Sequence, residues 1–164
     1  MKIEGEHIAI RSLRMSDAEH LFRWENDESI WSVSGRSEAL ELELIQDYIR
    51  GVRDIYLDKQ LRFIITENDH PIGTIDLFQF DQERATAGIG ILIGEIDARG
   101  SGYAKEALAL LVDYCKLYLG IRHLDALVPE ENEASLRLFK GQGFHEVDSI
   151  GGIRSLRLEL EEEE

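Results

Sequence analysis

Hydrophobic residues recur at two different spacings along this chain, and the spacing predicts where helices and strands lie. Residues 7–13 alternate between apolar and polar, as a half-buried strand does, and residues 16–19 form a capping box that opens a helix. Residues 38–52 place apolar side chains at helical spacing and predict a second helix. From Leu61 the period falls to two, so three strands of an antiparallel meander are expected at residues 61–67, 72–80 and 85–93.

The rest of the chain alternates helices with strands. A long helix is predicted over residues 101–119 and a short one over residues 131–141, with a strand at 123–129 between them. Residues 144–149 and 153–160 alternate on either side of two glycines, which predicts a closing hairpin. This element order indicates an α/β fold in which helices flank a mixed β-sheet.

A glycine-rich turn, RGSGYA over residues 99–104, joins the meander to the long helix. Such a turn directs several N–H groups of the helix's first turn at one point, and the helix dipole adds positive charge there, which suits a pyrophosphate. A dinucleotide fingerprint fits poorly. The spacing is not G-x-G-x-x-G, and the preceding strand belongs to a meander and not to a βαβ unit.

A second segment, LVPEENEASLRLFKGQGF over residues 127–144, places an asparagine after a strand, then a helix, then Gly-Phe. Together with the glycine-rich turn, it resembles the two motifs of the GNAT (Gcn5-related N-acetyltransferase) superfamily: an R/Q-x-x-G-x-G/A loop, and an Asn and a Tyr at fixed spacing before Gly-Phe. Residues 10–27 and 71–75 are similar to the branch that acetylates ribosomal-protein amino termini or polyamines. The positions that match the two motifs are Arg99, Gly102, Ala104, Asn132, Phe139, Gly143 and Phe144.

The resemblance implies the acyl-CoA N-acyltransferase fold, with acetyl-coenzyme A as acetyl donor. In this family the pantetheine arm lies beside the fourth strand, here residues 91–93, and a backbone N–H of that strand stabilises the oxyanion. The chain is strongly acidic, yet segments 89–108 and 127–144, which carry the two motifs, hold Arg99, Lys105, Arg137 and Lys140. A ligand with several phosphates requires such local positive charge. The alternative is that these are solvated helix charges. The cofactor-binding residues implied are Ile91, Leu92, Ile93, Arg99, Gly100, Ser101, Gly102, Tyr103, Ala104, Lys105, Asn132, Ser135, Phe139 and Lys140.

One position departs from the family pattern. Many members carry a tyrosine where this chain has Phe139, and that tyrosine protonates the leaving thiolate. Phenylalanine has no proton to give, although a thiol with a pKa near 8.5 already leaves well as the thiolate. The hydroxyls of Tyr103, Tyr114 and Ser135 are the candidates to replace it.

The attacking amine must also lose a proton. Asp76, on the second strand of the meander, and Glu95, after its third, are the candidate bases, and the alternative for each is a surface carboxylate. Asp27, Glu28 and Trp31 are candidates to hold a cationic substrate by charge and stacking. The alternative for Trp31 is a packed side chain.

Composition narrows the class of protein and its partners. The 164 residues suit a single domain over residues 1–164, with residues 161–164 as an acidic tail. The net charge of −15 disfavours nucleic acid and attracts cations such as polyamines, aminoglycosides or basic protein tails. Cys115 lies on an apolar helical face and is expected in the core, and the five histidines show no metal-ligand spacing, so no metal is expected. No apolar leader or membrane span is seen, which favours a cytoplasmic protein without a membrane partner.

The leading hypothesis is therefore an N-acetyltransferase that acts on a small cationic amine such as a polyamine or aminoglycoside. The alternative within enzymes is acetylation of protein amino termini, as in the ribosomal-protein branch. A weakly catalytic sensor that binds acyl-coenzyme A is the competing class, since Phe139 lacks a hydroxyl. A homodimer is expected only by analogy with relatives.

Overall fold

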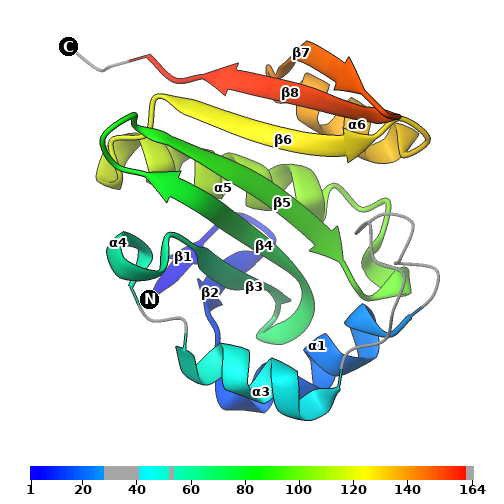
Figure 1. The fold of residues 1–164 in the computed structure, drawn as a ribbon. Helices are drawn as coiled ribbons and strands as arrows, with labels where there is room; N and C mark the ends of the chain where they lie inside the picture. The colour runs from blue at the N-terminus through cyan, green and yellow to red at the C-terminus, as the bar shows by residue number, and fades with distance from the viewer. Residues whose placement is uncertain (28–40, 52–53, 162–164) are drawn as a thin grey trace.

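The computed structural model describes residues 1–27, 41–51 and 54–161, and the strands within them form one mixed sheet (Figure 1). The strand order is β1-β2-β3-β4-β5-β6-β8-β7, and among these described strands only β5 and β6 pair in parallel. The strands span Lys2–Glu4 (β1), Ala9–Ser12 (β2), Leu61–Glu67 (β3), His70–Asp81 (β4), Thr86–Ile93 (β5), His123–Pro129 (β6), His145–Ile150 (β7) and Ile153–Glu159 (β8). The helices span Met15–Asp17 (η1), Ala18–Glu25 (α1), Leu42–Gly51 (α3), Ile55–Asp58 (α4), Ile96–Ala98 (η2), Tyr103–Tyr118 (α5) and Glu133–Gly141 (α6).

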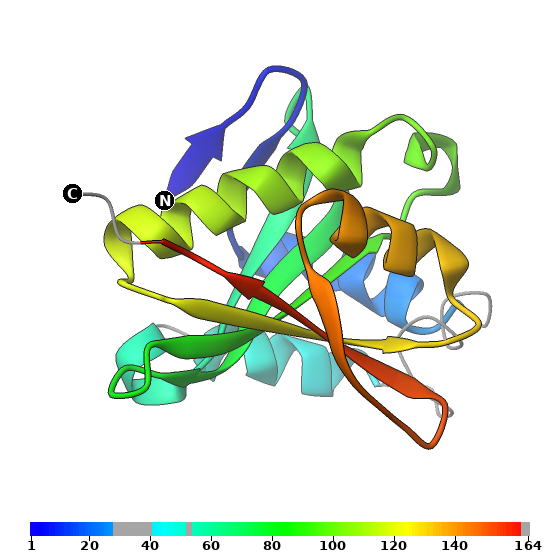
Figure 2. The same cartoon turned by 90° about the horizontal axis from the view of Figure 1, so that it is seen from above.

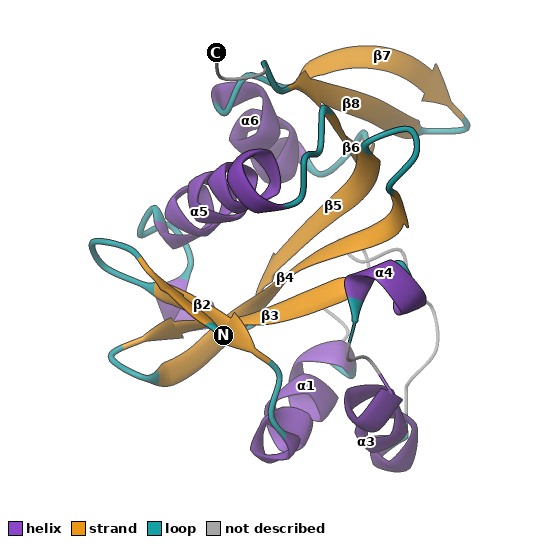
Figure 3. Ribbon diagram, turned by 90° about the vertical axis from the view of Figure 1, so that its left-hand side faces the viewer, coloured by secondary structure: helices purple, strands orange, loops and turns teal. Residues whose placement is uncertain are grey.

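Helices cover both faces of the sheet. α5 and α6 lie on one face and α1 and α3 on the other (Figure 3), and the view from above shows α5 crossing its face of the sheet (Figure 2). Successive side chains of a strand point to opposite faces, so one strand contributes to the apolar layer on each side of the sheet. Phe63 and Ile65 of β3 belong to the core on the α5 face. Ile64, between them, packs with Leu21 and Trp24 of α1. The sheet therefore separates two apolar layers.

Strands β5 and β6 are paired only where they begin. The paired residues run from Thr86 and His123 to Gly88 and Asp125, and the two strands then diverge (Figure 1). On its other side β5 stays paired with β4 as far as Ile93. Residues 89–93 therefore present one strand edge to an open gap.

The α/β fold with a mixed sheet flanked by helices is confirmed, and so is the antiparallel meander, which is β3, β4 and β5. The strands predicted at 61–67 and 123–129 have the bounds of β3 and β6. The buried position of Cys115 is confirmed as well, and burial raises the pKa of its thiol to about 12.

The strand predicted at residues 7–13 is present but shorter, as β2 over Ala9–Ser12, and β1 before it was missed. The chain turns before β2, where the N–H groups of His7 and Ile8 donate to the Glu106 carboxylate at 3.0 and 2.7 Å. The expected Ser16 capping box is wrong. The buried carboxylate of Asp17 organises this corner instead, accepting from the Arg14 N–H at 2.7 Å and pairing with Arg11 at 2.8 Å.

Two helix starts lie later than predicted, and one helix was missed. α5 begins at Tyr103 after the left-handed Gly102, and α6 begins at Glu133 because Asn132 caps it through the Ser135 N–H at 3.2 Å. The missed α4 is a single turn, too short to produce a helical period in the sequence. No helix among the described residues is long and apolar enough to cross a membrane.

Candidate active site

The amino-terminal end of α5 borders a cavity of about 420 Å³, which we call the helix cavity. It lies between this helix end, the second half of β5 and the start of α6. Most of its wall comes from the two segments that the motifs predicted. Its lining residues are Ile91, Leu92, Ile93, Ala98, Arg99, Gly100, Gly102, Tyr103, Ala104, Lys105, Asn132, Ala134, Ser135 and Leu138.

No side chain in the described part of the chain caps the start of α5. Its N-cap residue, Gly102, has a φ of 81°, and a Cβ at this position would meet nothing within 4 Å beyond its chain neighbours. Glycine adopts such a backbone without strain, and the first N–H groups of a helix have no acceptor inside it. The first turn of α5 therefore offers unpaired donors and the positive end of a helix dipole to the helix cavity.

The unpaired edge of β5 forms a second wall of polar backbone. The Gly94 N–H donates to the Ile72 carbonyl at 2.8 Å, so in an antiparallel ladder the alternate residues Ile91 and Ile93 direct their N–H and C=O groups away from β4. The Arg99 side chain confirms this direction, since its Nε donates to the Ile93 carbonyl at 3.0 Å. An extended ligand can hydrogen bond along this edge as an added strand would.

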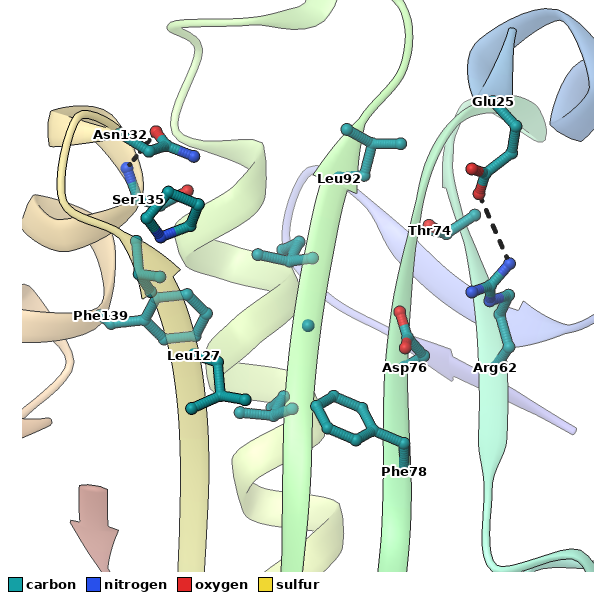
Figure 4. Close-up of a pocket in the computed structure, with 15 residues that line it drawn as sticks. Glu25, Arg62, Thr74, Asp76, Phe78, Leu92, Leu127, Asn132, Ser135 and Phe139 are labelled. Atoms are coloured by element: carbon teal, nitrogen blue, oxygen red, sulfur yellow. Dashed lines mark hydrogen bonds and ion pairs between the residues drawn. The ribbon is translucent and has the colours of Figure 1, made fainter. Parts of the chain in front are cut away.

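A smaller cavity of about 230 Å³, the sheet cavity, lies on the face of the sheet that α1 covers (Figure 4). Asp76 of β4 projects into it, and its carboxylate lies over Gly90, where a Cβ would be 3.6 Å from Oδ1. A Cβ at Gly90 would be in ordinary van der Waals contact with this carboxylate, so the carboxylate lies directly beside β5. The lining residues are Glu25, Arg62, Thr74, Asp76, Phe78, Ile89, Gly90, Ile91, Leu92, Leu127, Val128, Pro129, Asn132, Ser135 and Phe139.

Three ionisable side chains share the sheet cavity. Burial raises the pKa of the Asp76 carboxyl, the Arg62 charge opposes this rise, and Glu25 adds to it. Arg62 pairs with Glu25 at 3.7 Å from Nη1 to Oε1. A carboxylate whose pKa lies above its ordinary value is a stronger base than an exposed one.

The two cavities meet at the gap between β5 and β6. Ile91, Leu92, Asn132 and Ser135 line both of them. Figure 4 shows Asn132 and Ser135 on one side of the gap, with Leu92 on β5 and Asp76 beyond it on β4. A ligand group in one cavity can therefore reach a group held in the other.

The helix cavity fits coenzyme A. Unpaired amides at the end of α5 suit its pyrophosphate, the β5 edge suits the amides of its pantetheine arm, and Arg99 and Lys105 add positive charge to the wall. The open space above Gly102 lets phosphate oxygens approach the backbone. These are properties of the side chains and backbone present, so the donor set matches the ligand that the motifs imply.

Some predicted site residues lie outside both cavity linings. Ser101 is exposed in the turn, and Arg137 and Lys140 are exposed on α6. The Glu95 carboxylate accepts from Trp24 Nε1 at 3.1 Å and forms an ion pair with Arg23, so two partners already engage it. Asp27 lies just after α1, whereas Glu28 and Trp31 fall outside the described residues.

The three candidate hydroxyls lie in different places. Ser135 lines both cavities. Tyr103 lines the helix cavity, where its interaction with Glu67 raises its pKa. Tyr114 packs edge-on against Phe63 with a centroid separation of 6.2 Å and lines neither cavity. Phe139 is buried and faces the sheet cavity.

The sequence reasoning missed Glu25, Arg62 and Thr74. Arg62 stands out in LRFIITE as a charge between apolar residues of a strand, and this was the available signal. Its partner Asp76 lies directly opposite in the register of β3 and β4. Periodicity alone does not give that register, so the pair could not be recognised.

Residues 7–145 match the family model of the GNAT acetyltransferase domain. The chain belongs to the GNAT acetyltransferases. A GNAT relative, the uncharacterized N-acetyltransferase p20 of Bacillus licheniformis, is 30% identical over 142 residues, which cover 85% of this chain and 79% of the relative.

Two solved GNAT structures share the fold. The spermidine N-acetyltransferase of Vibrio cholerae, in complex with CoA and spermine, superposes with a TM-score of 0.84 at 18% identity over 94% of this chain and 96% of that one. A putative ribosomal-protein-serine acetyltransferase of the same species gives 0.76 at 19% identity, covering 98% of each chain. This GNAT protein is thus an N-acetyltransferase with acetyl-coenzyme A as its donor.

Proposed function

We propose that this enzyme acetylates a primary amine of a cationic molecule, with the amine in the sheet cavity and coenzyme A in the helix cavity. The observation that carries the proposal is the continuity of the two cavities at Ile91, Leu92, Asn132 and Ser135. Transfer without a covalent enzyme intermediate requires both reactants side by side. The described part of the chain meets this requirement at the gap between β5 and β6.

Asp76 is the base in this proposal. Bound acetyl-coenzyme A supplies an acetyl thioester that an uncharged amine can attack. The Asp76 carboxylate accepts a proton from the incoming ammonium and leaves the nitrogen lone pair available. Its position over Gly90 places the carboxylate beside β5, the strand whose free edge faces the helix cavity.

Backbone and hydroxyl groups complete the reaction. The Ile91 N–H, directed into the gap, donates a hydrogen bond to the carbonyl oxygen as negative charge develops there. Ser135 donates a hydrogen bond to the departing thiolate and relays to it the proton that the acylated nitrogen loses, because Ser135 is the one of the three candidates that lines both cavities. Phe139 supplies only an apolar wall.

The cationic acceptor is supported by charge. The chain carries −15, and both Glu25 and Asp76 line the sheet cavity. The Vibrio cholerae structure with spermine and the ribosomal-protein-serine acetyltransferase of the same fold represent the two classes considered, a polyamine and a protein terminus. Asp27, Glu28 and Trp31 remain proposed contacts for the rest of such a molecule, and an unchanged amine KM in Trp31→Ala would remove Trp31 from this set.

The test follows thiol release from acetyl-coenzyme A with spermidine, an aminoglycoside and a basic peptide with an unblocked amino terminus. We expect release above background with at least one of them, and mass spectrometry of the product to show one added acetyl group on nitrogen. Tight coenzyme A binding by calorimetry without release for any amine would contradict the proposal and support an acyl-coenzyme A sensor.

A further inference from the structure

Three positions form a row across the sheet below the sheet cavity. Arg62 of β3 lies opposite Asp76 of β4, and Asp76 lies opposite Gly90 of β5. Residues opposite each other in antiparallel strands place their side chains on the same face. A molecule that lies along this row therefore meets β5 first, the Asp76 carboxylate next and the Arg62 guanidinium last.

The Arg62 guanidinium is held in place but is not saturated with hydrogen bonds. Its Cζ lies 5.2 Å from the ring centroid of Tyr48, and Nη1 is 3.7 Å from Glu25 Oε1, which is longer than a hydrogen bond. Its Nε is buried and has no hydrogen-bond partner among the described residues. Among the described residues Arg62 forms an ion pair with Glu25 and not with Asp76, although the Arg62 and Asp76 charges do interact across the row.

We propose that Arg62 binds the carbonyl oxygen next to the reacting amine, so that the enzyme selects α-amino amides, the chemistry of a peptide amino terminus. This inference rests on the proposed function, since it needs the amine beside Asp76. The distances agree. Neighbouring strands are about 4.8 Å apart. In an amino acid the carbonyl oxygen lies about 3 Å from the amine nitrogen. An amine above β4 can therefore place its carbonyl toward β3, within reach of Arg62.

The charges of the sheet cavity favour a neutral carbonyl over the alternatives. A free amino acid would bring its carboxylate close to both Glu25 and Asp76, which repel it. A polyamine has a methylene next to the reacting nitrogen, which would leave the buried Nε of Arg62 without an acceptor. An amide carbonyl accepts from the guanidinium and adds no negative charge.

The test compares acceptors with and without an amide group next to the carbon that carries the amine. Alaninamide and sec-butylamine have nearly the same shape, and kcat/KM for each is calculated per unprotonated amine, with spermidine and alanine as further acceptors. We expect the full-length enzyme to prefer alaninamide to sec-butylamine. In Arg62→Met, kcat/KM for alaninamide should fall about 10–100-fold, while that for sec-butylamine changes less than about threefold.

Controls distinguish carbonyl binding by Arg62 from loss of the fold and from a role in positioning Asp76 or α1. Arg84→Met, in the exposed turn between β4 and β5, should leave both values unchanged, and calorimetry with coenzyme A checks that Arg62→Met is folded. A loss of equal size for both amines would show that Arg62 only positions Asp76 or α1. A wild-type preference for spermidine or sec-butylamine would also overturn the inference while the proposed function stands. No thiol release with any amine would overturn the proposed function first.

Discussion

The two cavities of this enzyme are built from different parts of the polypeptide. The helix cavity offers backbone, namely the first N–H groups of α5 and the free edge of β5, with Gly102 keeping side chains away. The sheet cavity offers side chains, and its polar groups come from α1, β3, β4 and the start of α6. In the proposed arrangement, backbone groups bind the shared ligand coenzyme A, whereas side chains that can change singly distinguish the acceptor.

This difference determines how each cavity tolerates substitution. Backbone donors survive most side-chain changes, so the helix cavity is damaged only where a new side chain occupies the turn. In the proposed reaction each polar side chain of the sheet cavity has its own role, so removing one side chain should remove that role alone. Four variants test this comparison, and the largest effect is expected at Asp76, the proposed base.

Asp76→Asn should lower kcat/KM for the amine about 10²–10⁴-fold, because the amide accepts no proton. Coenzyme A affinity should stay unchanged. In the unmodified enzyme, activity rises as pH rises through the pKa of Asp76, because the base must be ionised. Because burial raises the pKa of Asp76 above its ordinary value of 3.8, this increase in activity should occur at a pH above 3.8. The pH–rate profile of the variant should lack this limb, and Asp81→Asn at the end of the same strand serves as the control.

Two results would contradict this assignment. If Asp76→Asn were as active as the control Asp81→Asn at every pH, a group other than Asp76 would be the base. If it instead lost coenzyme A affinity, the two cavities would not be separable in the way their lining suggests.

Gly102→Glu tests the helix cavity and should weaken coenzyme A binding by about 100-fold or more. The substitution puts a side chain at a φ of 81°, which strains the backbone, and places a negative charge where phosphates are expected. Gly120→Glu is a matched control, since Gly120 also has positive φ, 63°, and follows the other end of α5. Calorimetry should show normal affinity for Gly120→Glu, and equal affinities for both variants would contradict the backbone site.

The same contrast explains what the sequence could and could not predict. The turn at residues 99–104 and the Asn132 cap are local, so small residues at fixed spacing indicated the wall of the helix cavity. Asp76 was identified as a candidate, but its row with Arg62 and Gly90 depends on the register of three strands. Glu25 reaches the same cavity from α1 through tertiary packing alone. Periodicity predicts which residues of one strand share a face, but it does not predict which residues of the neighbouring strands lie opposite them.

Ser135→Ala should lower kcat by about 10-fold, less than the loss at Asp76, because a thiolate is already a fair leaving group. Phe139→Tyr in the Ser135→Ala background should restore part of the loss, since Phe139 faces the sheet cavity and the added hydroxyl replaces the missing donor. The readout is kcat at saturating amine with the KM of acetyl-coenzyme A followed in parallel. Full activity of Ser135→Ala, or no gain from the second change, would remove Ser135 from the reaction.

The smallest effect is expected at Glu106, in the first turn of α5, where a side chain and not backbone ties the helix to the start of the chain. Its carboxylate accepts from the Ile8 N–H at 2.7 Å and contacts His7 Nδ1 at 2.8 Å. Burial opposes ionisation of Glu106, but these hydrogen bonds outweigh it and lower its pKa, while the bond to Glu106 raises the pKa of His7.

The signs of these two shifts define a pH window. The stabilisation that ionised Glu106 contributes to the fold is present above its ordinary pKa of 4.5, and it is lost as pH falls through its lowered pKa in the folded protein. The stabilisation that protonated His7 contributes is complete below its ordinary pKa of 6.5, and it is lost as pH rises through its raised pKa in the folded protein. Glu106→Gln should therefore lower Tm by about 2–4 °C near pH 5.5 and by less near pH 8.5. Coenzyme A affinity should not fall, because removing a negative charge from this helix end leaves the amides of α5 intact. A loss of affinity, with Glu83→Gln as the unaffected control, would show that the backbone site depends on this side chain after all.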